Sequence, residues 1–187
     1  VTLAIAAGVR VEFAGHHALH VQGRLLAVGT AAAPILFTPG DRSSGWNGLR
    51  FERTPATSGG SRLEHCVVEG ARAVRGGVGV GPLVCEGVGE LEVVDTVVRD
   101  NVADHGGALF CLHSAAPRLV GCLLTGNRAD LGGGAVFCVD GFPRLIACTV
   151  AGNRDANPEP MAEAAALLTY YGKPRITASI FWDNPTG

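Results

Sequence analysis

The sequence has few charged and aromatic residues and no long apolar run. Charged residues make up 17% of the 187 residues, aromatic residues make up 6%, and the formal net charge is −2 at pH 7. Lysine and arginine are scattered along the chain, so the basic stripe that nucleic acid or anionic lipid requires is missing, and we expect no nucleic-acid partner. No apolar run approaches the roughly 20 residues of a transmembrane helix, and we expect no membrane span.

Short cysteine spacings are missing as well. The six cysteines include no CxxC pair, which argues against a zinc or redox motif, and we expect no metal site. Abundant instead are glycine, with 27 residues, and proline, with 10, which indicate a chain that turns often. Because 47% of the residues are hydrophobic, we expect a single globular domain that covers residues 1–187.

Two stretches are nearly identical and reveal an internal repeat. TVVRDNVADHGGALFC begins at Thr96, and CLLTGNRADLGGGAVFC begins at Cys122. Similar segments follow at Cys148, 26 positions after Cys122, and at more variable spacing around Cys66 and Ser179. Large apolar residues lie three positions before and two positions after each of these five anchors, so the register extends over much of the chain.

The turn residues that separate the short apolar runs of the repeat predict a parallel β-helix. Short apolar runs are separated by GN, GG and P, a pattern of short strands rather than helices. A repeat unit that cannot bury its own apolar face stacks on its neighbours, strand over strand in parallel. We therefore predict an all-β solenoid of about seven coils, on the order of 30 Å long at the usual strand spacing.

The stacked coils are expected to bring equivalent residues into vertical ladders. Inward cysteines should be buried, free thiols, because the Cβ vectors of neighbouring rungs run side by side. Asparagine tolerates the left-handed conformation of a turn, and stacked amides hydrogen-bond from rung to rung. The expected structural ladders are Cys66, Cys122 and Cys148; Cys85, Cys111 and Cys138; and Asn101, Asn127, Asn153 and Asn184.

Outward charges of two neighbouring coils form complementary vertical pairs. Such pairs fix the register of adjacent strands, which is their simplest interpretation. They are also candidates for a sugar-acid site, in which carboxylates and a basic residue act together. The three expected pairs are Arg62 with Glu92, His65 with Asp95, and Glu69 with Arg99.

A column of like charge continues from this region. Arg118, Arg144 and Arg175 occupy equivalent outward positions in three successive coils. Like charges about 5 Å apart repel, so the arginines need solvent counterions, loop carboxylates such as Glu159 or Glu163, or an acidic ligand. The sequence therefore makes these arginines candidate ligand-binding residues.

The repeat also carries a resemblance to a known group of proteins. The run PRLVGCLLTGNRADLGGGAVFC, with GWNGLRF before it and ITASIFWDN after it, resembles the right-handed parallel β-helix repeat proteins of bacteria. These belong to the pectate-lyase-like superfamily, and the later coils also resemble the repeats of polymorphic outer-membrane proteins. The resemblance implies a right-handed coil and a secreted or cell-surface setting. Because this group contains polysaccharide lyases and hydrolases as well as adhesins, the fold does not imply catalysis.

Two functions remain open at this point. We expect a non-catalytic, extracellular structural or adhesin-like module that presents flat faces and loops to a glycan or protein and needs no cofactor. The alternative is a polysaccharide lyase or glycoside hydrolase that acts on an acidic polysaccharide, with Ca²⁺ bound in the case of a lyase. Its candidate catalytic residues are Glu92, Asp95, His65 and Arg118.

Neither end of the chain has an evident polar cap. The sequence starts with VTLAIAAGVRVEF and finishes with IFWDNPTG, and stacked strands at such ends expose unpaired edges. We therefore expect that the chain belongs to a longer protein or assembles end to end with other copies.

Overall fold

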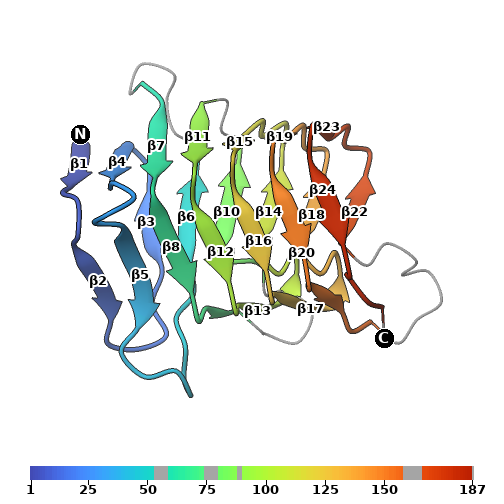
Figure 1. Cartoon of the computed structure of the whole chain (residues 1–187), viewed down its shortest axis with the longest axis horizontal. Helices are drawn as coiled ribbons and strands as arrows, with labels where there is room; N and C mark the ends of the chain where they lie inside the picture. The colour runs from blue at the N-terminus through green and yellow to red at the C-terminus, as the bar shows by residue number, and fades with distance from the viewer. Residues whose placement is uncertain (53–58, 74–79, 88–89, 158–165, 187) are drawn as a thin grey trace.

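The computed structural model describes residues 1–52, 59–73, 80–87, 90–157 and 166–186, and it confirms an all-β parallel solenoid. This part of the chain contains 24 strands and no helix. Each strand pairs in parallel with the equivalent strands of the neighbouring coils. The coils stack along the long axis of the molecule, with the two termini at opposite ends (Figure 1).

Four sheets form the walls, and they are numbered here in the order in which the chain passes through them. The first sheet contains β1 (Thr2–Ile5), β4 (Arg24–Val28), β7 (Ser61–Glu64), β11 (Leu91–Val94), β15 (Arg118–Val120), β19 (Arg144–Ile146) and β23 (Arg175–Thr177). The second contains β2 (Arg10–Phe13), β5 (Ile35–Pro39), β8 (Cys66–Glu69), β12 (Val97–Arg99), β16 (Leu123–Thr125), β20 (Thr149–Ala151) and β24 (Ile180–Trp182).

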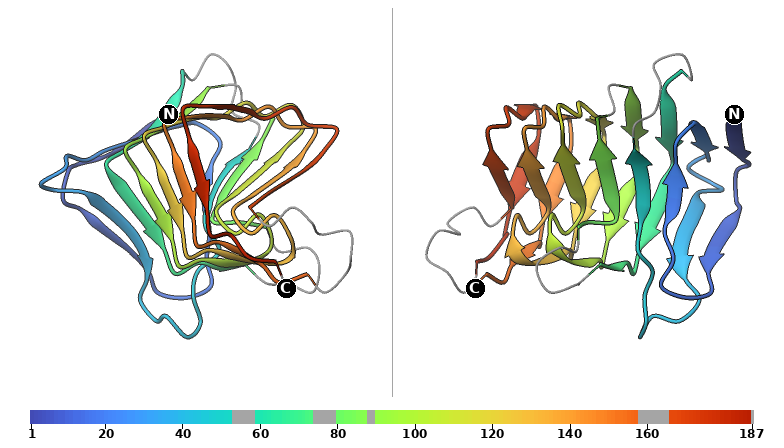
Figure 2. Two further views of the ribbon diagram at one scale, coloured as in Figure 1. Left: turned by 45° about the vertical axis from the view of Figure 1, so that its right-hand side comes forward. Right: turned by 180° about the vertical axis from the view of Figure 1, so that it is seen from behind.

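The other two walls are smaller. The third sheet contains β9 (Arg72–Ala73), β13 (Val102–His105), β17 (Arg128–Gly132) and β21 (Arg154–Asp155). The fourth contains β3 (Leu19–Val21), β6 (Leu49–Glu52), β10 (Leu83–Glu86), β14 (Leu109–Leu112), β18 (Val136–Val139) and β22 (Leu167–Tyr170). The chain thus completes about six turns, and Figure 2 shows the walls from two further directions. The right-handed winding stays a prediction.

Strand alternation explains where the core lies. Side chains at every second position point inward, and equivalent inward positions stack from coil to coil. In the first sheet Leu63, Val93, Leu119 and Leu145 are paired in sequence, and all four are fully buried. These are the aliphatic residues that lie three positions before the anchors, so the register inferred from the repeat is confirmed.

The asparagine ladder is present and fully hydrogen-bonded within the corner that it occupies. Asn101 Nδ2 donates to Asn127 Oδ1 at 2.9 Å, Asn127 Nδ2 donates to Asn153 Oδ1 at 2.8 Å, and Asn153 Nδ2 donates to Asn184 Oδ1 at 3.0 Å. Each amide also donates to a carbonyl of the preceding coil, as Asn127 Nδ2 does to Val98 O at 2.9 Å. The ladder therefore satisfies buried polar groups that the turn leaves unpaired.

The cysteine ladders are confirmed as well, with all six thiols free and buried. Cys85, Cys111 and Cys138 are paired across β10, β14 and β18. Burial raises the pKa of Cys66 to about 12, and hydrogen bonding with the Cys148 thiol together with burial raises the pKa of Cys122. A protonated Cys66 thiol suits the small interior corner in which this residue lies.

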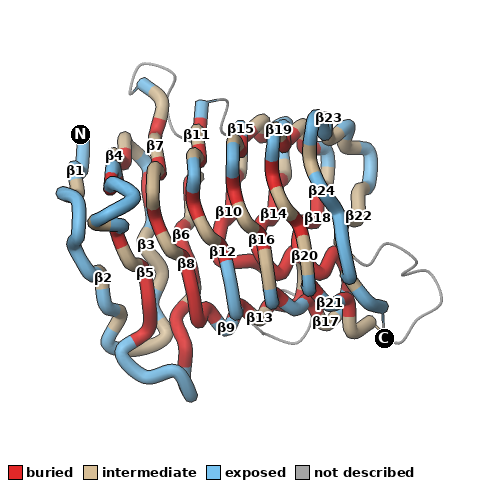
Figure 3. Tube along the Cα trace, in the orientation of Figure 1, coloured by how far each residue is buried: buried red, intermediate tan, exposed pale blue. Residues whose placement is uncertain are grey.

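Burial falls off toward both ends of the stack. In Figure 3 the buried segments follow the middle coils, whereas β1, β2 and β24 are largely exposed. Ile176 and Phe181 continue the inward rows of the first and second sheets, yet they are 46% and 37% exposed because β23 and β24 are the last strands of these sheets among the described residues. Association of such surfaces end to end stays a prediction.

Candidate functional site

The outer face of the first sheet carries a continuous charged row. Outward positions of adjacent strands lie directly over one another, because the coils pair in register. Proline precedes three of the arginines, at Pro117, Pro143 and Pro174, where it marks the first residue before each strand. From coil to coil the row consists of Leu26, Arg62, Glu92, Arg118, Arg144 and Arg175.

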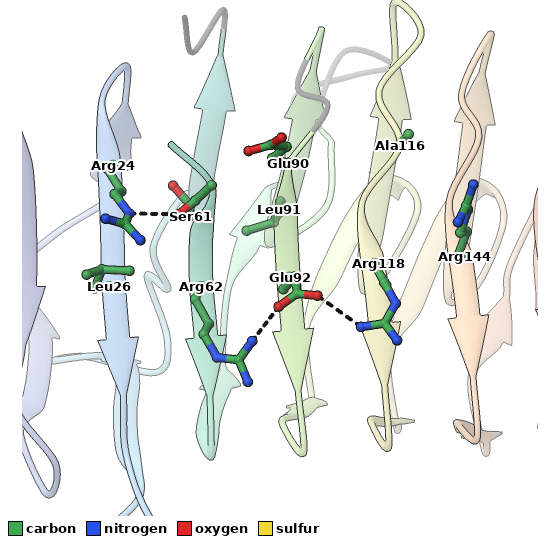
Figure 4. Close-up of a pocket in the computed structure, with 11 residues that line it drawn as sticks. Arg24, Leu26, Ser61, Arg62, Glu90, Leu91, Glu92, Ala116, Arg118 and Arg144 are labelled. Carbon is green, nitrogen blue, oxygen red and sulfur yellow. Dashed lines mark hydrogen bonds and ion pairs between the residues drawn. The ribbon is translucent and has the colours of Figure 1, made fainter. Parts of the chain in front are cut away.

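Glu92 is the centre of the paired half of this row. One carboxylate oxygen contacts Arg62, and the other accepts a hydrogen bond from Arg118 Nη1 at 2.9 Å (Figure 4). Arg62 Nε also donates to Glu64 Oε2 at 2.7 Å. The contacts with Glu64 and Glu92 raise the pKa of Arg62, so this guanidinium stays charged. The expected pair of Arg62 with Glu92 is therefore confirmed.

The other half of the row has no such neutralisation. Arg144 and Arg175 lie on successive rungs and are exposed, and neither has a carboxylate partner among the residues that the structure describes. The loop carboxylates proposed from the sequence, Glu159 and Glu163, lie outside the described residues. The exposed Lys173 adds a further positive charge beside Arg175. An excess of positive charge therefore accumulates at this end of the sheet.

A groove of about 610 Å³ runs over the middle of the row. Its floor contains small and apolar residues, among them Gly60, Leu91 and Ala116. Arg24 and Glu90 form one side of it, and Arg24 Nε is held by Gly60 O at 2.9 Å. The charged residues that line the groove are Arg24, Arg62, Glu90, Glu92, Arg118 and Arg144.

This mixture of groups fits a polar, acidic ligand. Guanidinium groups bind carboxylate or sulfate in a bidentate manner, and carboxylates accept hydrogen bonds from hydroxyl groups. An apolar floor between them suits the C–H faces of a sugar ring. Four arginines against two glutamates leave the groove with a net positive charge of 4 − 2 = 2.

The structure separates the other two candidate catalytic residues from this groove. His65 and Asp95 occupy the corner between the first and second sheets, where both have a positive φ, of 46° and 44°. No hydrogen bond or ion pair joins these two side chains in the described part of the chain. The equivalent residues of later coils are Gly121, Ala147 and Ala178, with the same left-handed backbone. This position is thus set by the turn, whatever side chain it carries.

Sequence reasoning missed three residues that line the groove, Arg24, Leu26 and Glu90. Arg24 and Leu26 belong to a coil before the first anchor, and the stretch of chain from β4 through β5 and β6 to β7 is longer than the spacing of the later repeats. Glu90 lies directly before β11, outside the positions at which equivalent residues recur. The alternation of Arg24, Leu26 and Val28 with the buried Leu25 and Ala27 is the signal that identifies this outer face.

Among the described residues, no three His, Cys, Asp or Glu side chains come together in a way that holds a metal ion. The same part of the chain contains no helix long and apolar enough to cross a membrane. Comparison of the chain with protein families, with curated proteins and with solved structures finds no match.

Proposed function

We propose that the chain is a non-catalytic binding module of the cell exterior that holds an acidic polysaccharide along the outer face of its first sheet. The observation that carries the proposal is the exposed column of Arg118, Arg144 and Arg175, of which only Arg118 has a carboxylate partner in the described part of the chain. The resemblance of the later coils to bacterial β-helix proteins supports the extracellular setting.

The spacing of the column favours a polymer over a single small anion. Successive strands are about 4.8 Å apart, so the guanidinium groups repeat along the solenoid axis at the scale of one sugar unit. Repulsion between neighbours is on the order of 1 kcal/mol in water at such distances, and an anion placed between them removes it. A chain with one acidic group per unit would therefore lie across the strands and contact several rungs at once.

The groove also supplies contacts for the hydroxyl groups and the C–H faces of a sugar. Glu90 and Glu92 can accept hydrogen bonds from hydroxyl groups, while the half-buried Leu26 and Ala116 provide apolar surface. Such a site binds its ligand without a requirement for proton transfer. Of the four residues of the lyase alternative, Glu92 and Arg118 line the groove and are bonded to each other, whereas His65 and Asp95 do not line it.

Binding to polygalacturonate, measured by affinity electrophoresis and calorimetry, tests the proposal. Replacement of Arg144 and Arg175 by glutamine should weaken binding at least about tenfold, since hydrogen bonds between charged groups contribute about 1.5–3 kcal/mol each. The matched control is the double variant Arg10→Gln/Arg154→Gln, which removes the same charge from the second and third sheets. Its affinity should stay within about twofold of that of the parent, because salt largely screens exposed charges that lie far from the site.

Two results would contradict the proposal. Equal loss of affinity in both double variants would show that net charge alone attracts the polymer. Absorbance from unsaturated products, abolished by Asp95→Ala, would instead support the lyase. Binding without product, lost only in the first-sheet variant, is the outcome that we expect.

A further inference from the structure

A second cationic groove lies on the third sheet, beside the loop that joins β5 to β6. This loop, residues 40–48, extends beyond the strands at the lower left of Figure 1. Its turn is held by Asp41, which accepts hydrogen bonds from the hydroxyl and the backbone N–H of Ser43, both at 2.8 Å. These bonds lower the pKa of Asp41, and the N–H of Gly45 closes the turn on Asp41 O at 3.0 Å. The loop is therefore a well-defined wall.

Glu69 anchors this wall to the solenoid. Its side chain is only 5% exposed and contacts Arg42 Nη2 of the loop at 2.6 Å and Arg99 Nη2 of the next coil at 2.8 Å. The Glu69 backbone carbonyl accepts the indole N–H of Trp46 at 2.8 Å. Trp46 in turn stacks on Phe13, with ring centroids 4.1 Å apart. The expected pair of Glu69 with Arg99 is thus confirmed, and it also holds the loop.

The same loop positions Arg72 on β9. The backbone N–H of Arg72 donates to Trp46 O at 3.0 Å. Gly45 has a φ of 66°, and a Cβ atom at this position would lie 2.5 Å from Arg72 Cγ. Glycine is therefore required for the loop to pack this closely on the Arg72 side chain. These contacts with the loop hold the Arg72 side chain in place.

The groove between the loop and the third sheet has a volume of about 570 Å³. Arg72 and Arg128 flank Val102 in the strand register, about 10 Å apart at the usual strand spacing. Arg128 Nε donates to Asp130 Oδ1 at 2.7 Å, an arrangement that leaves its two Nη groups for a ligand. Arg72 has no acidic partner in the described part of the chain. The lining residues are His16, Ser44, Arg72, Val102, Arg128 and Asp130.

We propose that this groove binds a tetrahedral oxyanion, the phosphate or sulfate ester group of a ligand, between Arg72 and Arg128. Arg72 and Arg128 lie two rungs apart with Val102 between them, so a ligand that contacts both needs acceptor oxygens that point in several directions, which a planar carboxylate lacks. His16 Nδ1 lies 3.4 Å from Ser44 O, a contact that ties this lining residue to the loop. The groove is on a different wall from the first-sheet site and is independent of it.

Calorimetric titration with phenyl phosphate, phenyl sulfate and benzoate tests this assignment. We expect one of the two esters to bind at least about tenfold more tightly than benzoate, and the tighter ester identifies the chemistry of the ligand. Arg72→Gln and Arg128→Gln should each weaken that binding about tenfold or more. Gly45→Ala should also weaken it, although it removes no charge, because the loop must move away from Arg72.

Two control variants make the result specific. Arg154→Gln lies on the next rung of the same sheet but outside the groove, and Arg144→Gln lies in the first-sheet row. Both should bind the preferred ester as the parent does, and thermal melting should show that every variant is folded. Benzoate binding as tight as that of both esters, or unchanged ester binding in Arg72→Gln and Arg128→Gln, would overturn the proposal.

Discussion

Arg118 Nη1 lies 2.9 Å from Glu92 Oε1, and this bond joins two adjacent rungs of the first sheet. The second oxygen of the same carboxylate contacts Arg62. Glu92 therefore forms ion pairs with Arg62 and Arg118. Both arginines lie in the same outward row as Arg144 and Arg175. The ion pair limits the length of the cationic column, since it neutralises one end and leaves the other end charged.

Replacement of Glu92 by glutamine should lengthen the site. The neutral amide keeps the size of the side chain but frees Arg118 for an acidic polymer and leaves Arg62 with Glu64 as its remaining carboxylate partner, so polygalacturonate should bind several-fold more tightly. The effect should shrink as salt is added, because screening weakens contacts between exposed charges. Glu12→Gln is the matched control, since Glu12 pairs with Arg10 at 2.8 Å on the second sheet. Equal gains in both variants would argue against a defined column.

The asparagine ladder should be a major source of stability. In Asn127→Ala, Asn101 loses the acceptor of its side-chain amide and of its backbone N–H, and Val98 O loses its donor. Each buried group left unpaired costs about 1–3 kcal/mol, so the free energy of unfolding should fall by about 2–4 kcal/mol. Urea denaturation of this variant beside Thr125→Ala, an outward change on β16, measures the difference. Equal stability of the two variants would contradict the role of the ladder.

The repeat made most of the fold accessible from sequence alone. Anchors such as Cys122 and Cys148 recur with flanking apolar residues, and that register is the one in which β16 and β20 pair. Similar logic identified the asparagine ladder, because a small amide at a fixed offset has a clear stacking partner. The corners were less accessible, since Asp95 and Gly121 share one left-handed backbone but have unrelated side chains.

The candidate sites were predicted only where they follow the register. Arg118 and Arg144 recur at one offset and were found, whereas Arg24 lies in a coil without an anchor. Arg72 and Arg128 both lie six positions after an anchor, so their alignment on the third sheet was predictable from the repeat. The repeat did not indicate that the loop of residues 40–48 lies beside them. The position of that loop depends on the contacts of residues 40–48 with Glu69 and Arg72.

The buried thiols should make stability depend on pH in the alkaline range. The pKa of Cys66 is raised from 9.0 to about 12 by burial, so the unfolded chain releases this proton before the folded chain does. The contribution of the neutral thiol is complete below pH 9 and is lost as the pH rises toward 12, by about 1.4 kcal/mol per pH unit.

Comparison with Cys66→Ser isolates this effect. Serine can make similar hydrogen bonds in the corner, as Thr96 and Ser179 do on other rungs, but it does not titrate. Urea unfolding at about pH 8 and about pH 10.5 should show the stability of the parent falling relative to the variant. A constant difference between the two proteins would contradict a buried, protonated Cys66.

Under the proposed function, several arginine rungs bind one acidic polymer at the same time. Calorimetric titration with galacturonate oligomers of increasing length tests it directly. The affinity should rise with each added unit until the oligomer covers the column of Arg118, Arg144 and Arg175, and then level off. In Arg144→Gln/Arg175→Gln the rise should disappear. An affinity that is the same for short and long oligomers, or no binding of any of them, would contradict the proposed function.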